Sequence, residues 1–431
     1  MIKKFTSVLL MLFISTLGFS QVTTPSLTEQ NANEEKGQFS GNFQSNFQGY
    51  VKDSAIGANT TQYEKELSSA DAWLFLNYKY RGFNFSLRYD VFNNTPLFDP
   101  FRAYTQSGVG YWQVSKDIEK FNITVGNFYD QFGSGIIFRA YEDRNIGIDF
   151  SVMGARVIYN PTENTRIKAF TGQQKFLFDR RTPVIKGVNI EHRLNVSENL
   201  VADLGGSFVN RTIDQATMNT IASTINSYAI EDRFDPKYNV FGYNAYTTLS
   251  YKKYRLYFEY AKKTPEALMG LDQRMFKASG DVYYTSLSYS TKGVGISAQY
   301  RRINNFQFRT SPLETSPLPS YGALINYLPA LTRQNTYRLL ARYNAVMQEL
   351  GENAAQLEMT FKPNKKWQIN INGAATTTLS GIDFSKGADV LKWDTTTRLF
   401  REFYIDVVRK VNNKLKVMGG VQIIGYNQTT F

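Results

Sequence analysis

The sequence predicts an all-β protein, a transmembrane antiparallel up-and-down β-barrel of about 16–18 strands. Three observations lead to this prediction. Apolar and polar side chains alternate along most of the chain, the alternating stretches have similar lengths, and the connections between them are short and long in turn. Alternation with a period of two gives each strand one apolar and one polar face.

The alternation is regular in many segments. In the stretch 83–91, apolar Phe83, Phe85 and Leu87 alternate with polar residues, and 254–260, 356–361 and 367–372 repeat the pattern. The predicted strands are about 9–12 residues long, which is the length needed to cross a bilayer at a tilt. A soluble β-sandwich also alternates, but uniform strand length and alternating connection length favour a barrel.

The connections fall into two classes. Short turns, such as Arg81-Gly82 and Lys252-Lys253, consist of residues that favour tight turns or are readily solvated. Longer segments carry most of the prolines, which cannot donate a hydrogen bond to a neighbouring strand, and are therefore predicted as outer loops. These predicted loops are 52–69, 93–103, 130–148, 173–184, 211–238, 264–280, 304–353 and 379–395.

The N-terminus predicts export. Lys3 and Lys4 precede an apolar run, and Gly18-Phe19-Ser20 provides the small residues of a cleavage site, so residues 1–20 are predicted as a signal peptide. Residues 21–37 are polar and without periodicity, as in a flexible periplasmic leader. The barrel is predicted to occupy residues 38–431 of the outer membrane, with the lipid bilayer and, during biogenesis, the barrel-assembly machinery as partners.

Composition excludes several classes of site. The net charge is +12, but the charges are scattered, so we expect no nucleic-acid partner. The chain has no Cys and a single His, which rules out a His/Cys metal site, and we expect neither a metal nor a cofactor. An outer-membrane hydrolase would need His192 as its base. Polar filler on a lumen-facing strand is the far more common role for such a residue, so we predict no catalytic residues and no enzyme.

The strand count raises a question of parity. The sequence gives about 17 strands, the last near 415–425 and running outward, whereas bacterial single-chain barrels have even numbers. Two explanations stay open: the native chain continues beyond Phe431, or a further strand lies within 304–353, near Thr336 to Tyr343.

The segment 126–156, GNFYDQFGSGIIFRAYEDRNIGIDFSVMGAR, is the most distinctive motif. It leaves one predicted strand, passes a glycine-rich turn and re-enters another. Its charges either line a constriction or ligand site inside the barrel, or pin the loop to the barrel wall through charged hydrogen bonds. The candidate ligand or lumen-loop residues are Asp130, Arg139, Glu142, Asp143, Arg144 and Asp149.

The same segment resembles a family of uncharacterised outer-membrane proteins from Bacteroidota that share a domain of unknown function. The stretch LTRQNTY at 331–337 is also similar, and the resemblance extends over most of the mature chain. Members of that family look longer at the C-terminus, in agreement with the odd strand count. The resemblance implies an outer-membrane location and a bacterial source, and it implies no activity or catalytic residue.

Two functions follow from these features with similar weight. A pore or transporter for a small polar solute would use the charged inward faces and long loops. The alternative is a loop-plugged structural or assembly barrel that scaffolds a cell-surface or secretion complex. Predicted inward-facing aromatic residues favour a filled lumen: Trp73, Phe75 and Tyr404.

Overall fold

A single curled sheet forms most of the protein. The structure, a computed structural model, describes residues 36–99, 101–270, 272–316, 318–333, 347–379 and 398–426. The sheet has 17 strands, which confirms the predicted all-β class and strand number. All its pairings are antiparallel and join strands that follow one another along the chain, except that β5 (Phe121–Phe128) pairs with β10 (Val152–Thr162). The loop between them contains four short strands: β6 (Asp130–Phe132), β7 (Phe138–Ala140), β8 (Glu142–Asp143) and β9 (Ile148–Asp149).

The first half of the wall is made of β1 (Gln38–Gly49), β2 (Ser68–Tyr80), β3 (Phe83–Thr95), β4 (Tyr104–Ile118), β5 (Phe121–Phe128), β10 (Val152–Thr162), β11 (Thr165–Phe176) and β12 (Asp179–Ser197). The second half is made of β13 (Leu200–Thr212), β14 (Asn239–Tyr251), β15 (Tyr254–Met269), β16 (Met275–Thr291), β17 (Val294–Asn304), β18 (Gly351–Asn364), β19 (Trp367–Thr378), β20 (Arg398–Lys410) and β21 (Lys416–Tyr426).

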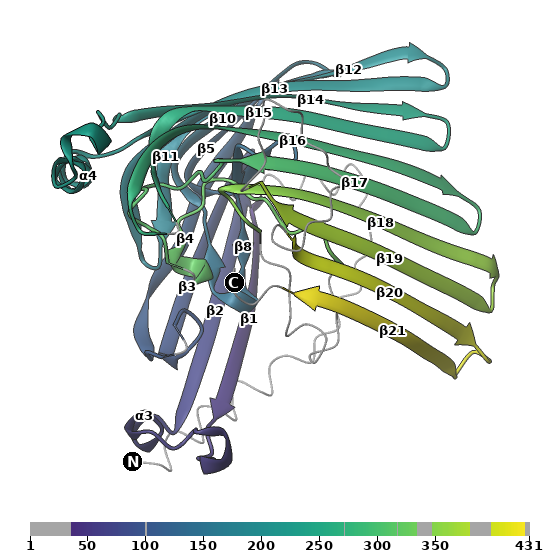
Figure 1. The fold of residues 1–431 in the computed structure, drawn as a ribbon, viewed down its shortest axis with the longest axis horizontal. Coiled ribbons are helices and arrows are strands. Elements are labelled where there is room, and N and C mark those ends of the chain that lie inside the picture. Colours follow the sequence, from purple (N-terminus) through teal and green to yellow (C-terminus); the bar gives the residue numbers. More distant parts are fainter. Residues whose placement is uncertain are drawn as a thin grey trace.

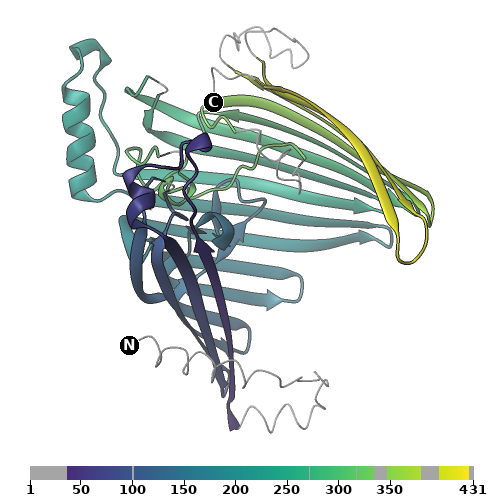
Figure 2. The ribbon, with the colours of Figure 1, turned by 90° about the horizontal axis from the view of Figure 1, so that it is seen from below.

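Short turns collect at one end of the wall, on the right of Figure 1 for β12 to β21, and the long connections collect at the other end. Within the described part of the chain, β1 and β21 each have a partner on one side only (Figure 2). These two edges run in the same direction, because successive strands alternate in direction and the count is odd. They therefore have no antiparallel pairing with each other.

The outer face of the wall is apolar. Side chains that point outward remain exposed although they are large and hydrophobic, while their neighbours along the strand point inward and are buried or half-buried. Leu74, Leu87, Ile190, Phe258 and Leu357 are examples of exposed outward residues. The period of two in the sequence thus corresponds to two distinct environments on the two faces of the sheet.

The prediction of long loops at 173–184 and 264–280 is wrong. In the structure β11 and β12 continue to a tight turn at Leu177-Phe178, and β15 and β16 continue to a turn within 270–274. Each hairpin shifts register next to its proline, at Pro183 and at Pro265. A bulge leaves a residue unpaired, so a proline costs no ladder hydrogen bond there. Proline in these segments marks a bulge within a strand instead of a loop.

The predicted loop 211–238 contains a helix that the sequence reasoning missed, α4 (Gln215–Asn226). Asp214 caps it, with its side chain accepting a hydrogen bond from the Thr217 N–H at 3.0 Å. Met218, Ile221 and Ile225 form its buried stripe and pack against residues of β15 and β16. The loop 50–67 holds a shorter helix, α3 (Thr61–Lys65). The described residues contain no helix of the length and apolarity that a membrane crossing requires.

Several predictions fall on residues that the structure does not describe. These are the signal peptide, the leader as far as residue 35, the segment Thr336 to Tyr343, most of the loop 379–395 and the terminal Phe431.

Two connecting segments, 129–151 and 305–333, fold into the interior and together form what we call the plug. Apolar plug residues form a buried core with inward-facing residues of the wall, one from each of β5 and β10 to β17. From the plug these are Phe132, Ile136, Ile137, Phe138, Ala140, Phe306, Phe308, Ile325 and Leu328; from the wall they are Phe128, Val152, Phe170, Ile185, Val209, Val240, Ala261, Val282 and Ile303.

The two plug segments also bond to each other. The Arg139 N–H donates to the Ile325 carbonyl at 2.9 Å, and the Tyr327 N–H donates to the Gly135 carbonyl at 2.9 Å. The second segment then crosses to the far side of the wall, where Thr332 donates to Glu402 on β20 at 2.6 Å. The plug is therefore anchored on opposite sides of the interior.

Replacing Phe138 tests the plug core. This side chain is 1% exposed and stacks on Phe170 with ring centres 4.3 Å apart. We expect Phe138→Ala to cost about 3–5 kcal/mol, because it leaves a cavity between plug and wall. Thermal unfolding followed by gel mobility measures this cost. Ile146→Ala removes a 46% exposed side chain of the same segment and should change little. Equal stability of the two variants would contradict a packed plug.

Candidate functional site

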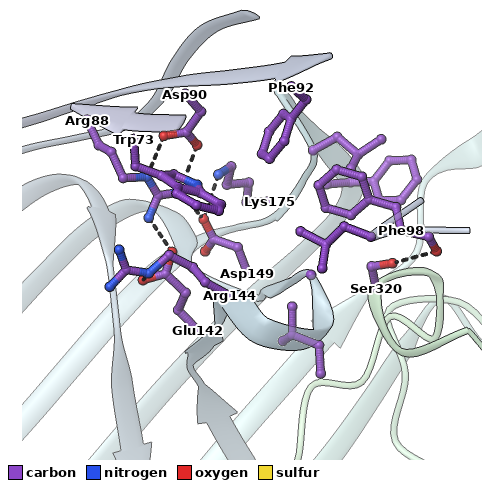
Figure 3. A pocket seen from close by; sticks show the side chains of 15 residues that line it. Trp73, Arg88, Asp90, Phe92, Phe98, Glu142, Arg144, Asp149, Lys175 and Ser320 are labelled. Carbon is purple, nitrogen blue, oxygen red and sulfur yellow. Dashed lines mark hydrogen bonds and ion pairs between the residues drawn. The ribbon is translucent and has the colours of Figure 1, made fainter. Parts of the chain in front are cut away.

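A buried cluster of charges fixes the first plug segment to the wall. It centres on Arg88 of β3, which points into the interior and meets two plug carboxylates (Figure 3). The Arg88 guanidinium lies 2.8 Å from the Asp149 carboxylate and donates a short hydrogen bond to Glu142. It also donates to Asp90 at 2.7 Å, two positions along the same strand and thus on the same face.

Lys175 completes this cluster from β11. Its ammonium lies 2.6 Å from the Asp149 carboxylate, which also accepts a hydrogen bond from the Tyr129 hydroxyl at 3.0 Å. Burial by itself would raise the pKa of Asp149, but Lys175 and Arg88 outweigh it and hold this pKa at about 2. Burial raises the pKa of Glu142 in spite of Arg88. Asp149 is therefore the carboxylate that anchors the loop in its charged form.

A second anchor lies at the start of the same segment. Asp130 is bound by two wall cations, Arg156 of β10 at 3.1 Å and Lys168 of β11 at 2.9 Å. The tip of the segment has a third anchor, since the Ser134 N–H donates to the buried carboxylate of Glu259 on β15 at 3.0 Å. The wall thus holds the segment at both ends and at its tip.

The remaining predicted residues are less tightly held. Arg144 lies at the rim of the cluster, 3.6 Å from Glu142, and donates to Gln44 of β1 at 3.2 Å. Asp143 caps a turn of 3-10 helix, η2 (Arg144–Ile146), by accepting from the Asn145 N–H at 3.1 Å. Arg139 faces two tyrosine rings, Tyr141 and Tyr327. Glu142, Arg144 and Asp149 therefore share one hollow, while Asp130, Asp143 and Arg139 lie outside it.

Sequence reasoning missed the wall partners of these residues. Arg88, Lys175, Arg156 and Lys168 supply the cations, and Glu259 supplies the carboxylate at the tip. The only signal in the sequence was a charged residue at an inward position of an alternating strand. Arg88 and Asp90, for example, alternate with outward Leu87, Tyr89 and Val91. That signal shows which face a charge occupies, but not which loop reaches it.

His192 does not face the lumen as the sequence suggested. Its neighbour Glu191 points inward and accepts from the Tyr246 hydroxyl at 2.9 Å, so alternation puts His192 on the outer face with exposed Ile190 and Leu194. Its Nδ1 lies 2.8 Å from the Thr165 hydroxyl on the next strand. Among the described residues, no group of three or more His, Cys, Asp or Glu side chains is placed to hold a metal ion.

The charges of this cluster hold the first plug segment to the wall. Its carboxylates, Asp90, Glu142 and Asp149, are matched in number by Arg88, Lys175 and Arg144. Buried charges that are paired and hydrogen-bonded are stable, whereas removing one partner leaves the other desolvated and uncompensated. This arrangement satisfies the plug charges with wall charges.

Comparison with known proteins gives one family. A model of the family of unknown function DUF6029 matches residues 1–431. No curated protein matches the sequence.

Solved structures show a general likeness. Pseudomonas aeruginosa OccK8 (OprE) is 10% identical with a TM-score of 0.48, covering 90% of this chain and 94% of that chain. P. aeruginosa OpdK with vanillate is 11% identical with a TM-score of 0.44, covering 91% of this chain and 94% of that chain. P. aeruginosa OccD3 (OpdP) is 11% identical with a TM-score of 0.43, covering 91% of this chain and 87% of that chain. Similarity this low assigns no function to the chain. Its fold is established by the strand pairing described above.

Removing the central cation should release the first plug segment. We expect Arg88→Gln to destabilise the protein by about 3–5 kcal/mol, since it leaves buried carboxylates without their partner. The measurement is the free energy of unfolding in lipid vesicles. Arg193→Gln is the matched control, because its pair with Asp203 is exposed and should contribute little. If both variants had the same free energy of unfolding as the parent, Arg88 would not hold the plug to the wall.

Asp149 also predicts a pH dependence. Its folded pKa of about 2 lies below the ordinary aspartate value of 3.8, so the stability it provides is complete above about pH 4 and is lost as the pH falls toward 2. The stability difference between the parent and Asp149→Asn should therefore be constant from pH 7 to about pH 4 and then shrink. Unfolding titrations at several pH values measure it. A difference that shrinks already above pH 5 would contradict this assignment.

Proposed function

Since the chain belongs to the family of unknown function DUF6029, we propose its role from its geometry: it is an outer-membrane β-barrel whose lumen is closed by its own loops and which serves as a structural part of the cell envelope. The apolar outer face and the strand lengths support the membrane location. A tilted strand of about 9–11 residues crosses a bilayer, and the strands of this wall reach or exceed that length apart from β5.

The plug core is the observation that carries the closed state. A barrel of 16–18 strands leaves an aqueous channel unless something fills it. Here Phe132, Phe138, Phe306 and Phe308, each at most 1% exposed, pack in the interior against successive strands. Ions crossing this layer would have to leave water, which is unfavourable. In this proposal the plug closes the lumen next to β5 and β10 to β17, the strands that contribute to this core.

A second candidate is a gated transporter for a small polar solute. It is favoured by a polar hollow on the short-turn side of the plug, lined by residues that include Glu191, Asp203, Tyr246 and Tyr257, with Gly133 of the plug at its border. In this alternative the ion pairs of Asp130 and Asp149 would be the fastenings that a solute or partner releases. An assembly partner in the envelope remains a proposal for either candidate.

Conductance in planar bilayers distinguishes the two. For the closed barrel we expect the parent protein to insert without stable current steps, because the plug core excludes ions. Loosening both anchors with Asp130→Asn and Asp149→Asn should produce current, whereas Asp203→Asn, which breaks an exposed pair, should not. Stable, uniform steps from the parent protein would reject the closed barrel and favour the transporter.

A further inference from the structure

Arg139 differs from the other charged residues of the plug. Its backbone N–H is fixed to the second plug segment, and its guanidinium carbon lies 4.1 Å from the centre of the Tyr327 ring and 4.9 Å from that of Tyr141. The two rings meet edge to face with centres 5.2 Å apart. Gly135 leaves room for this arrangement, since a Cβ there would lie 3.3 Å from Arg139 Cβ and Cδ. Both plug segments therefore position the side chain.

No residue in the described part of the chain accepts a hydrogen bond from this guanidinium. Among the described residues, Arg139 makes no side-chain hydrogen bond and no ion pair, and none of its nitrogen atoms is among the buried polar atoms without a partner. Solvent therefore reaches its N–H groups. Buried arginines elsewhere in the interior each lie within ion-pair distance of a carboxylate: Arg88, Arg181, Arg211 and Arg301.

The free donors define the ligand chemistry. A guanidinium presents parallel N–H groups that match the two oxygens of one carboxylate. A phosphate at neutral pH carries nearly two charges and is usually bound by several cations, whereas Arg139 offers one. The tyrosine rings beside it provide an apolar surface with polar edges, which suits a planar apolar body. A small carboxylate with such a body fits these groups better than an inorganic anion.

We propose that Arg139, resting on Tyr141 and Tyr327, is an anion-binding site of the plug that takes the carboxylate of a small organic acid. The site joins the two plug segments, so an occupied site bridges them. It lies outside the hollow of the Arg88 cluster, whose charges are already paired. The proposal goes beyond the closed barrel and does not depend on conductance.

Binding of benzoate to the purified full-length protein tests this proposal. Saturation-transfer-difference NMR in chloride buffer should show a saturable signal that acetate displaces and phosphate at equal ionic strength does not. Arg139→Gln should weaken binding by roughly tenfold or more, because charged hydrogen bonds are lost. Arg139→Lys keeps the charge without the paired N–H groups, so it should bind benzoate more weakly than the parent and more tightly than Arg139→Gln.

The controls separate binding from plug integrity. Arg102→Gln removes an exposed charge outside the plug and should bind benzoate like the parent. Protease resistance of residues 129–151 shows whether each Arg139 variant keeps its plug folded. The proposal is overturned if the parent gives no saturable signal, if Arg139→Gln binds as the parent does, or if phosphate displaces benzoate as well as acetate does. If Arg139→Gln loses its plug, the Arg139→Lys variant decides, and unchanged binding by a folded Arg139→Lys also overturns it.

Discussion

Ion pairs between the wall and the plug determine how the interior of this protein is arranged. The first plug segment brings carboxylates, Asp130 and Asp149, to cations that project inward from β3, β10 and β11. The second segment contributes charges of both signs, since Arg333 lies 3.2 Å from Asp406 of β20 and Glu314 pairs with Arg181 of β12. Each segment therefore fits one part of the wall, because placing like charges together in a desolvated interior would be costly.

Apolar packing and charge pairing have separate roles in this arrangement. The phenylalanine-rich core buries apolar side chains of the plug against the wall, which is favourable. The ion pairs add less net stability, but they specify where each segment lies, because a displaced segment would leave buried charges unpaired. Under the proposed function the lumen is closed at rest, and opening it would break these ion pairs together with the core.

The candidate residues show how far sequence reasoning reaches. The segment 126–156 was recognised from its density of charges and glycines, and the structure brings Glu142, Arg144 and Asp149 of this segment into one hollow. Their partners Arg88 and Lys175 are distant in sequence, and their inward positions on alternating strands were the only local signal. Arg139 looked like its charged neighbours in the sequence. Only the position of Tyr327, 188 residues further along the chain, sets it apart.

Local patterns determined the architecture, because alternation with a period of two and tight-turn residues act within one hairpin. These patterns gave the all-β class, the strand number and the two kinds of connection. The tertiary structure decided what local patterns cannot encode. It placed Pro183 and Pro265 in bulges within long hairpins, formed α4 where Met218, Ile221 and Ile225 find an apolar surface, and turned His192 to the outer face. It also folded residues 129–151 inward, because the partners that stabilise this loop lie on strands far apart in the sequence.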